Sequence, residues 1–307
     1  MNVFLIFLLY ALNGSTFTIS KILIEHTSPI FAVGSRMLIA GAMLLAYYRF
    51  ILGKKFDVPK KAIKLLVQST LFNIFIPYCL RYWSMKYVTA TKTAFFYNLL
   101  PFITHAIACA IGIEKGSWKK GLGLGIGLLG ILPILISSSP GEKLLGSICF
   151  ISLPELALLG TVTAFAYSWI VIQKIVKVHH VSPILLNGVN MFFGGILALC
   201  VSFIAQESHA ISGPLEFAGW MVVIIVITNF ICYNLYATLL KHFSTTLISF
   251  ASLTMPFFAA LTGWAYFGEG ISWHNLISSA VTMIGLYIFF IAEREQKEPH
   301  DIIVIEA

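Results

Sequence analysis

Residues 26–41 read HTSPIFAVGSRMLIAG, and residues 180–195 read HVSPILLNGVNMFFGG. At this constant shift of 154 residues, a histidine, a serine, a proline, an isoleucine, a methionine and two glycines coincide. Residue types of this kind seldom match by chance over so short a stretch. The segment therefore indicates that the chain contains an internal duplication.

A second series of matches lies further along the chain, at a shift of 155 residues. It superposes Pro101 on Pro256, Glu114 on Glu269, and Trp118 on Trp273. The matches extend the duplication over most of the sequence. We predict a first repeat at 1–138 and a second at 154–292, with a linker at 139–153 and a tail at 293–307.

The composition excludes water as the main solvent of the protein. Of the 307 residues, 58% are hydrophobic and 11% are charged, whereas a soluble domain carries about 25% charged residues. Uncharged apolar runs of about 20 residues, long enough to cross a bilayer as a helix, recur along the chain. We predict an all-α integral membrane protein of ten transmembrane helices. The expected spans are 2–24, 30–52, 62–82, 90–112, 118–138, 154–176, 182–205, 216–239, 245–267 and 273–292.

Each copy has an odd number of spans, so the second copy must enter the membrane from the side where the first one leaves it. The ten helices are therefore expected to form two inverted five-helix repeats joined by an external linker. Inverted repeats are typical of secondary transporters, which bind substrate at the interface of the two units and alternate access to it. A duplicated scaffold that transports nothing is the alternative.

Lysine and arginine predict the orientation, because they resist translocation. With the N-terminus inside, fourteen of them fall in cytoplasmic loops or the tail, and four fall outside. We expect a multi-pass protein of the plasma (inner) membrane with both termini in the cytoplasm. The net charge of +7 then reflects topology and contact with anionic membrane lipid. Nucleic acid is not an expected partner, because the basic residues lie in short segments between apolar runs.

Two stretches of the chain resemble the EamA family of the drug/metabolite transporter superfamily. The first is WSMKYVTATKTAFFYNLLPFITHAIACAIGIEK, at 83–115, and the second is LLKHFSTTLISFASLTMPFFAALTGWAYFGEGISW, at 239–273. Each contains a loop lysine, a helix start rich in small residues, a proline within the helix and a closing glutamate. The chain departs from the pattern at Lys92, where the family has an arginine.

The resemblance implies a ten-helix carrier whose central cavity is lined by spans 1, 3, 4, 6, 8 and 9, with spans 5 and 10 at the periphery. It also implies a small-molecule substrate. Family members commonly export amino acids, and some relatives take up larger nucleoside-derived solutes. The resemblance alone does not select among these substrates.

Polar side chains at membrane depth cost free energy unless they are paired or face water, so they are the best guide to a cavity. The residues in these spans are mostly aromatic or uncharged hydrogen-bonding groups, which suit a substrate with an apolar part and a few polar groups. For each residue alone, packing between helices is an equally good explanation. The candidates are Asn13, Thr16, Tyr78, Tyr97, Asn98, Tyr167, Trp169, Asn229, Tyr233 and Thr254.

Two prolines are hinge candidates. Pro101 and Pro256 lack an amide hydrogen, so each leaves the carbonyl group four residues earlier without its helical partner and weakens the helix there. A static kink is the alternative, since neighbouring groups can satisfy the freed carbonyl.

Arg36 is the candidate for a charge at the outer mouth of the carrier. It lies about six residues into its expected span, about 9 Å along a helix, which is close enough for its side chain to snorkel to the surface. A positive mouth would attract carboxylates or phosphates. Its expected partners in this field are Lys21, Arg81 and Lys92.

Neither a cofactor nor a metal site is expected, and no catalytic group is apparent. The five cysteines lie far apart, without a CxxC pair. The stretch GLGLGIGLLG at 121–130 contains a GxGxxG pattern, but no strand precedes it. It is better explained as small-residue faces for close helix contact, and a homo-oligomer through this glycine-rich span is one possibility.

We therefore expect a transporter that works by alternating access, and not an enzyme. Export of amino acids or related metabolites is the first hypothesis. Uptake or exchange of a larger nucleoside-like or cationic solute, such as S-adenosylmethionine, is the second. A membrane scaffold or receptor that transports nothing is the alternative from another class.

Overall fold

The computed structural model describes residues 4–112, 118–130, 132–133, 147–148, 151–232, 235, 254–269 and 273–297. Within these residues the chain forms ten consecutive helical segments, some of them made of two to four shorter helices. The elements are α1 (Phe4–His26), α2 (Pro29–Ala46), η1 (Tyr47–Ile51), η2 (Lys60–Ala62), α3 (Ile63–Ser69), η3 (Thr70–Phe75), α4 (Ile76–Met85), α5 (Ala90–Phe96), η4 (Tyr97–Leu99), α6 (Leu100–Ala110), α7 (Trp118–Leu129), β1 (Ser147–Ile148), β2 (Ile151–Ser152), α10 (Leu153–His179), α11 (Pro183–Ile204), α12 (Pro214–Ile224), η5 (Ile225–Cys232), α15 (Met255–Phe267) and α16 (Trp273–Lys297).

The prediction of ten helices is confirmed for the described residues, with one addition. Two-residue strands β1 and β2 pair in antiparallel fashion just before α10, and the periodicity of the sequence gave no signal for so short a pairing. Parts of four expected spans, at 2–3, 131, 134–138, 233–234, 236–239 and 245–253, fall outside the described residues.

The outer surface of the bundle is that of a membrane protein. Six helical segments among the described residues are long and apolar enough to cross a bilayer. Large hydrophobic side chains lie exposed on several of them, including Phe193, Phe203, Leu215 and Val222. Exposing so much apolar surface to water would be unfavourable, whereas lipid chains solvate it. The protein is a multi-pass membrane protein.

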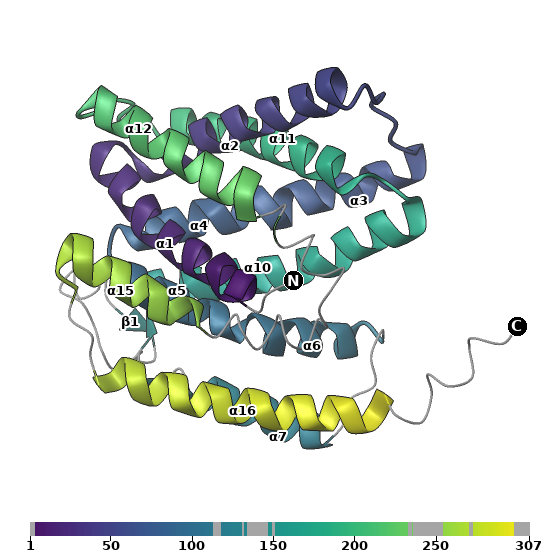
Figure 1. Ribbon diagram of the computed structural model, residues 1–307, viewed down its shortest axis with the longest axis vertical. Coiled ribbons are helices and arrows are strands. Elements are labelled where there is room, and N and C mark those ends of the chain that lie inside the picture. The colour runs from purple at the N-terminus through teal and green to yellow at the C-terminus, as the bar shows by residue number, and fades with distance from the viewer. Residues whose placement is uncertain are drawn as a thin grey trace, which may run out of the picture.

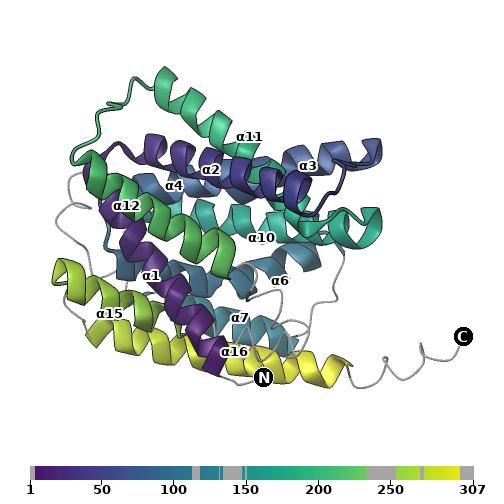
Figure 2. The same ribbon diagram turned by 45° about the horizontal axis from the view of Figure 1, so that its top comes forward.

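The helices lie side by side in one bundle and run roughly across the page in Figure 1. The pair α2 and α11 lies at one end of the bundle, and the pair α7 and α16 lies at the opposite end, in both Figure 1 and Figure 2. Helices α1, α4, α5, α10 and α15 lie between the two pairs. Spans 5 and 10 are thus peripheral, as the resemblance to the EamA family implies.

Equivalent helices of the two halves make equivalent contacts. Helix α1 packs against α15 and α12, and α10, which occupies the place of α1 in the second half, packs against α6 and α4. The second helices of the two halves, α2 and α11, pack against each other, as do the last helices, α7 and α16. Exchanging the halves reproduces these contacts, as expected for a duplicated chain.

The repeated glycines explain the close contact of α2 with α11. Gly34 and Gly41 lie against the backbone of α11, and Gly195 lies against the backbone of α2 near Leu38. A Cβ atom at any of these positions would overlap the neighbouring helix. In a membrane, where lipid is as apolar as a side chain, such close backbone approach is a main source of helix association.

Two helices widen at equivalent places. The third span contains a π-helical turn, η3, that begins at Thr70, and the eighth span contains another, η5, that begins at Ile225. Both turns carry buried polar side chains, among them Asn73 and Asn229. A π-helical turn inserts an extra residue and occurs frequently at functional sites. The two turns therefore mark a polar zone inside the bundle.

The fourth span is broken immediately before its proline. A 3-10 turn, η4, covers Tyr97–Leu99, and α6 restarts at Leu100 with Pro101 as its second residue. Pro256 likewise is the second residue of α15. Both prolines thus stand where a missing amide hydrogen costs no helical bond. That Pro101 and Pro256 act as hinges stays a prediction.

The contact between α7 and α16 provides a test of the packing. A Cβ atom at Gly123 would lie 2.7 Å from the carbonyl oxygen of Gly285 and 2.7 Å from the amide nitrogen of Phe289, whereas a Cβ atom at Gly125 meets nothing within 4 Å. We expect Gly123→Ala to lower the free energy of unfolding by about 1 kcal/mol or more, because backbone atoms must move apart.

The matched control is Gly125→Ala on the same helix, which is expected to leave stability unchanged or to raise it slightly through better helix propensity. Thermal unfolding of the two variants in detergent measures the difference. Equal midpoints for both variants would contradict the assigned face of α7.

Candidate functional site

Several helix ends meet at one face of the bundle. Helix α1 ends at His26 and α2 begins at Pro29, and α4 ends at Met85 shortly before α5 begins at Ala90. Each short connection places the two ends that it joins at one membrane surface, and Glu269, which contacts both Lys21 near the end of α1 and Ala90 at the start of α5, places both connections at the same surface. We call it the distal face, and it lies toward the left of Figure 1.

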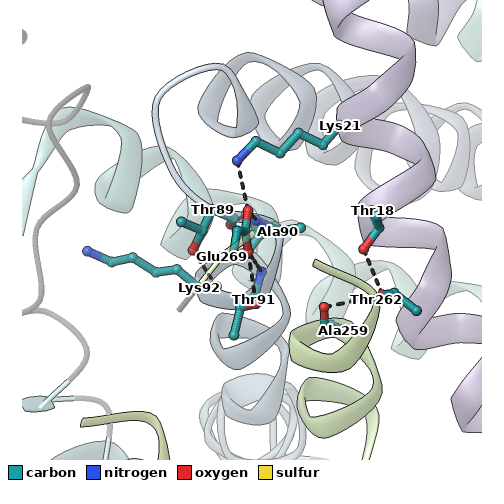
Figure 3. Close-up of polar contacts among 10 residues, drawn as sticks. Thr18, Lys21, Thr89, Ala90, Thr91, Lys92, Ala259, Thr262 and Glu269 are labelled. Carbon is teal, nitrogen blue, oxygen red and sulfur yellow. Dashed lines mark hydrogen bonds and ion pairs between the residues drawn. The ribbon is translucent and has the colours of Figure 1, made fainter. Parts of the chain in front are cut away.

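Glu269 joins three segments at the distal face. Its carboxylate accepts a hydrogen bond from Nζ of Lys21 at 2.9 Å and another from the amide N–H of Ala90 at 3.1 Å. It also accepts hydrogen bonds from the amide and the hydroxyl group of Thr91, at 3.4 and 3.0 Å. Figure 3 shows these groups converging on the glutamate from α1 and from the first turn of α5. The negative charge interacts favourably with the N–H groups at the start of α5, which have no partner within the helix. The glutamate thus fastens α1 and α5 to the end of α15.

A second polar contact joins α1 and α15 further along the line of contact between these two helices, which we call the seam. The hydroxyl groups of Thr18 on α1 and Thr262 on α15 lie 2.7 Å apart, as Figure 3 shows. Gly14 of α1 lies directly against the backbone of α15. The seam between the two helices is therefore closed by polar and steric contacts together.

A buried ion pair forms another polar contact at the distal face. Nζ of Lys92, in the first turn of α5, lies 2.5 Å from the carboxylate of Glu155, which is 1% exposed in the first turn of α10. The same carboxylate accepts the amide N–H of Ser152 at 2.6 Å in a capping box. Lys92 points away from Glu269 in Figure 3. The pair joins α5 of the first half to α10 of the second.

Beneath this face, aromatic rings surround two arginines. We call the group formed by Arg36, Arg81, Tyr78, Tyr82 and Tyr97 the arginine–tyrosine cluster. Nη1 of Arg36 donates to the hydroxyl group of Tyr82 at 2.8 Å, and Nη1 of Arg81 reaches the hydroxyl group of Tyr97 at 3.5 Å. The guanidinium carbon of Arg81 lies 4.5 Å from the ring centre of Tyr78 and 5.2 Å from that of Tyr82.

Helices α1 and α10 complete the walls of this cluster. The ring of Phe17 on α1 stands edge-on to Tyr97, and its centre lies 5.4 Å from the guanidinium carbon of Arg81. Phe165 on α10 contacts the rings of both Tyr78 and Tyr97. Side chains of both halves of the protein therefore meet at the arginine–tyrosine cluster.

The expected positive charge at the outer mouth is contradicted by these positions. Arg36 is 1% exposed and does not snorkel to the surface. Lys21 and Lys92 are paired with Glu269 and Glu155, and Arg81 is buried. The sequence argument failed because it counted charges along the chain and had no means of placing the glutamates, distant in sequence, that neutralise the lysines.

Of the predicted cavity residues, Tyr78 and Tyr97 lie together in the arginine–tyrosine cluster. Asn98 is buried next to Tyr97. Thr16 is buried too. Its hydroxyl group donates to the carbonyl group of Asn13, one turn earlier in the same helix, so this hydrogen bond stays within α1. Asn13 is half-buried on the same helix.

Other candidates lie elsewhere in the bundle. Tyr167 packs edge-on against Phe72, and Trp169, two residues later, is 46% exposed. Asn229 is buried in η5, where its amide donates to Sδ of Met191. Thr254 precedes α15 and is half-buried, and Tyr233 lies outside the described residues. The structure thus gathers some of the predicted residues and disperses others.

Sequence reasoning missed Tyr82 and Phe17 as members of the site, and it assigned Arg81 only to a charged outer mouth. Arg81 falls at the edge of an expected span, where a charge needs no explanation, and a tyrosine or phenylalanine in a membrane helix is unremarkable. The available signal was the segment PYCLRYW at 77–83. It places Tyr78 and Tyr82 one turn apart on a helix, beside the charge.

No group of three or more histidine, cysteine, aspartate or glutamate side chains in the described part of the chain is arranged to hold a metal ion. The polar groups in and beside the arginine–tyrosine cluster are instead hydroxyl, amide and guanidinium groups. Such groups bind organic ligands through hydrogen bonds and ring contacts.

Comparison with known proteins gives a consistent result. Residues 1–136 and 152–291 each match the EamA-like transporter family. Over 300 residues the chain is 30% identical to the S-adenosylmethionine/S-adenosylhomocysteine transporter of Chlamydia muridarum (strain MoPn / Nigg), covering 96% of this chain and 93% of that protein. The transporter of the same description from Chlamydia trachomatis serovar L2 is also 30% identical, covering 96% of this chain and 91% of that protein.

More distant matches agree on the fold. The uncharacterized inner membrane transporter YedA of Escherichia coli (strain K12) is 24% identical, covering 92% of this chain and 91% of that protein. One crystal structure superposes with a TM-score of 0.67 at 15% identity, covering 95% of this chain and 98% of the other. At that identity the likeness supports the fold alone.

Proposed function

Because the chain belongs to the EamA-like transporter family, we propose that it carries S-adenosylmethionine, S-adenosylhomocysteine or a closely related nucleoside-linked amino acid across the membrane by alternating access. It is a transporter and not an enzyme. The observation that carries the choice of substrate is the similarity to the Chlamydia transporters over nearly the whole length of both chains. This favours the second substrate hypothesis from the sequence over the first.

The arginine–tyrosine cluster supports a substrate of this kind. Aromatic rings of Phe17, Tyr97 and Phe165 offer flat contact surfaces for a nucleobase. Hydroxyl and amide groups nearby are suited to fixing the orientation of a polar ligand. Both halves contribute side chains, as expected for a carrier whose site lies at the repeat interface.

The repeats are proposed to be inverted. Five helical segments precede the linker at 139–153 and five follow it, so the second half starts on the side of the membrane where the first ends. The equivalent contacts of α1 with α15 and of α10 with α6 support exchange of the two conformations between the halves. The repeat boundaries at 1–138 and 154–292 and a cytoplasmic position of both termini, including the tail at 293–307, belong to the same proposal.

Placement in the inner membrane, with lipid around the bundle, is also part of this proposal.

A homo-oligomer through α7 is restricted by the fold, since the face that contains Gly123 and Gly127 is occupied by α16 and Phe102. The exposed face with Gly121 and Gly125 is the part of this helix left for a second copy.

Counterflow in proteoliposomes tests the function. We expect labelled S-adenosylmethionine to enter vesicles containing the purified protein, and to enter several times faster when unlabelled S-adenosylhomocysteine is trapped inside. Protein-free vesicles are the control. Flux of labelled amino acids without flux of either nucleoside would reinstate amino-acid export as the function, and no flux of any compound would favour a scaffold or receptor.

A further inference from the structure

Two guanidinium groups lie buried together without a carboxylate. Arg36 is 1% exposed and Arg81 is 6% exposed. Among the residues that the structure describes, neither arginine makes an ion pair, although Lys21 and Lys92 both do. A charge inside a membrane protein is costly unless it is paired, and such charges commonly mark a substrate path. The missing partner therefore requires an explanation.

The guanidinium groups are also short of hydrogen-bond acceptors. Arg36 makes one hydrogen bond, to Tyr82, and its Nε has no partner among the described residues. Arg81 makes two, to Tyr97 and Ser20, both at the limiting length of 3.5 Å, and its Nε is likewise unpaired. A guanidinium group presents a fork of five N–H donors, so most of the donors here lack an acceptor.

The pair lies where a ligand entering from the distal face would arrive. Arg81 is four residues from the end of α4 and Arg36 is seven residues after the start of α2, which places them about 6 and 10 Å beneath that face along their helices. Ser20, which Arg81 contacts, directly precedes Lys21, whose side chain meets Glu269 above it. The two unpaired arginines thus lie deeper in the bundle than the contact between Lys21 and Glu269 at the distal face.

We propose that Arg81 and Arg36 bind the α-carboxylate of the substrate, a group that S-adenosylmethionine and S-adenosylhomocysteine share. This inference rests on the proposed function and assigns one part of the ligand to named residues. The planar fork of an arginine matches a carboxylate with two parallel hydrogen bonds. One anion between two guanidinium groups supplies both the missing charge and the missing acceptors.

A purely structural role makes a different prediction. If Arg81 serves only to hold Tyr78 and Tyr82 in place through ring contacts, its loss weakens every ligand of the cluster equally. If it binds the carboxylate, its loss weakens only the ligands that possess one. The comparison of matched ligands therefore separates the two roles, whatever happens to overall stability.

The experiment measures dissociation constants of the full-length protein in nanodiscs for S-adenosylhomocysteine and for 5′-methylthioadenosine, which keeps the nucleoside and the sulfur but lacks the amino-acid group. Decarboxylated S-adenosylmethionine is compared with S-adenosylmethionine in the same way. The variants are Arg81→Gln, Arg81→Lys and Arg36→Gln. Arg49→Gln, an exposed arginine in η1, is the control.

We expect the wild type to bind the carboxylate-containing member of each pair roughly 100-fold more tightly, since burying a charged group without its partner is costly. Arg81→Gln is expected to remove most of that ratio by weakening only the carboxylate-containing member of each pair. Arg81→Lys keeps the charge without the fork and is expected to retain part of the ratio. Arg36→Gln should reduce the ratio as well, and Arg49→Gln should leave it unchanged.

Two outcomes overturn the carboxylate site: a wild type that binds both members of a pair equally, or an Arg81→Gln protein that loses affinity for both to the same degree. Failure of the proposed function is distinguishable from either, because then no nucleoside ligand binds the folded wild type at all. In that case a panel of amino acids is measured instead. Binding of an amino acid that depends on Arg81 supports the carboxylate site, and binding independent of Arg81, or none, overturns it.

Discussion

Lys92→Met is expected to lower the free energy of unfolding by about 3–5 kcal/mol, because it leaves the carboxylate of Glu155 buried without its counter-charge. The carboxylate is 1% exposed and Lys92 is buried beside it, so water cannot replace the ammonium group. The amide of Ser152 continues to donate to Glu155, but it carries no net charge. Thermal unfolding in detergent measures the loss.

Two further variants test whether the effect belongs to the pair. Lys92→Met combined with Glu155→Gln should recover much of the loss, because the double variant contains no unpaired buried charge. Lys64→Met, at an exposed lysine of α3, is the matched control and should unfold close to the wild type. A single variant at Lys92 that unfolds with the control would contradict the buried pair.

Glu269→Ala is expected to lower the free energy of unfolding by about 2–3 kcal/mol, because it leaves several hydrogen-bond donors without an acceptor. The side chain of Glu269 is 9% exposed, and that of Lys21 is 20% exposed, so Lys21 regains some water while the amides of Ala90 and Thr91 do not. Lys21→Met should cost less, since Glu269 then keeps its N–H and hydroxyl donors. Thermal unfolding of the two variants gives the order.

The control for Glu269 lies at the same face. Glu216 is 73% exposed and its carboxylate is 3.8 Å from Nε2 of His26, and an exposed ion pair of this kind contributes at most about 1 kcal/mol. Glu216→Ala should therefore leave the unfolding temperature nearly unchanged. If both glutamate variants behave alike, Glu269 does not fasten α1 and α5 to the end of α15 as the contacts indicate.

The transport rates of these variants bear on the mechanism. Both polar contacts join segments that come from different halves of the protein, α1 with the end of α15 and α5 with α10. In a carrier with alternating access such contacts must break when the distal face opens. We expect Glu269→Ala to alter the rate of counterflow more than the affinity for substrate.

Some features of the site were accessible from the sequence because they depend on one residue at a time. Tyr78, Tyr97 and Asn98 were identified as polar or aromatic groups at membrane depth, and all three lie in or beside the arginine–tyrosine cluster. Trp169 met the same criterion and is exposed instead. The difference between it and Tyr167 is one of helix rotation, which residue type does not encode.

The ten helices, the duplication and the family could all be predicted without coordinates. Each follows from runs or repeats read along the chain: an apolar run of about 20 residues must span a bilayer as a helix, and the histidine, proline and glycine pattern of 26–41 recurs at 180–195. These properties are independent of how the helices pack.

The pairing of the charges, in contrast, depends on how the helices pack. Lys21 meets Glu269 across 248 positions of the chain, while Arg36 and Arg81, equally charged in the sequence, meet tyrosines. The choice depends on the rotation of each helix, and glycine contacts between backbones, such as those of α2 with α11, fix that rotation. Because these contacts join residues far apart in sequence, no local pattern contains them, and the unpaired arginines emerge only when the bundle is assembled.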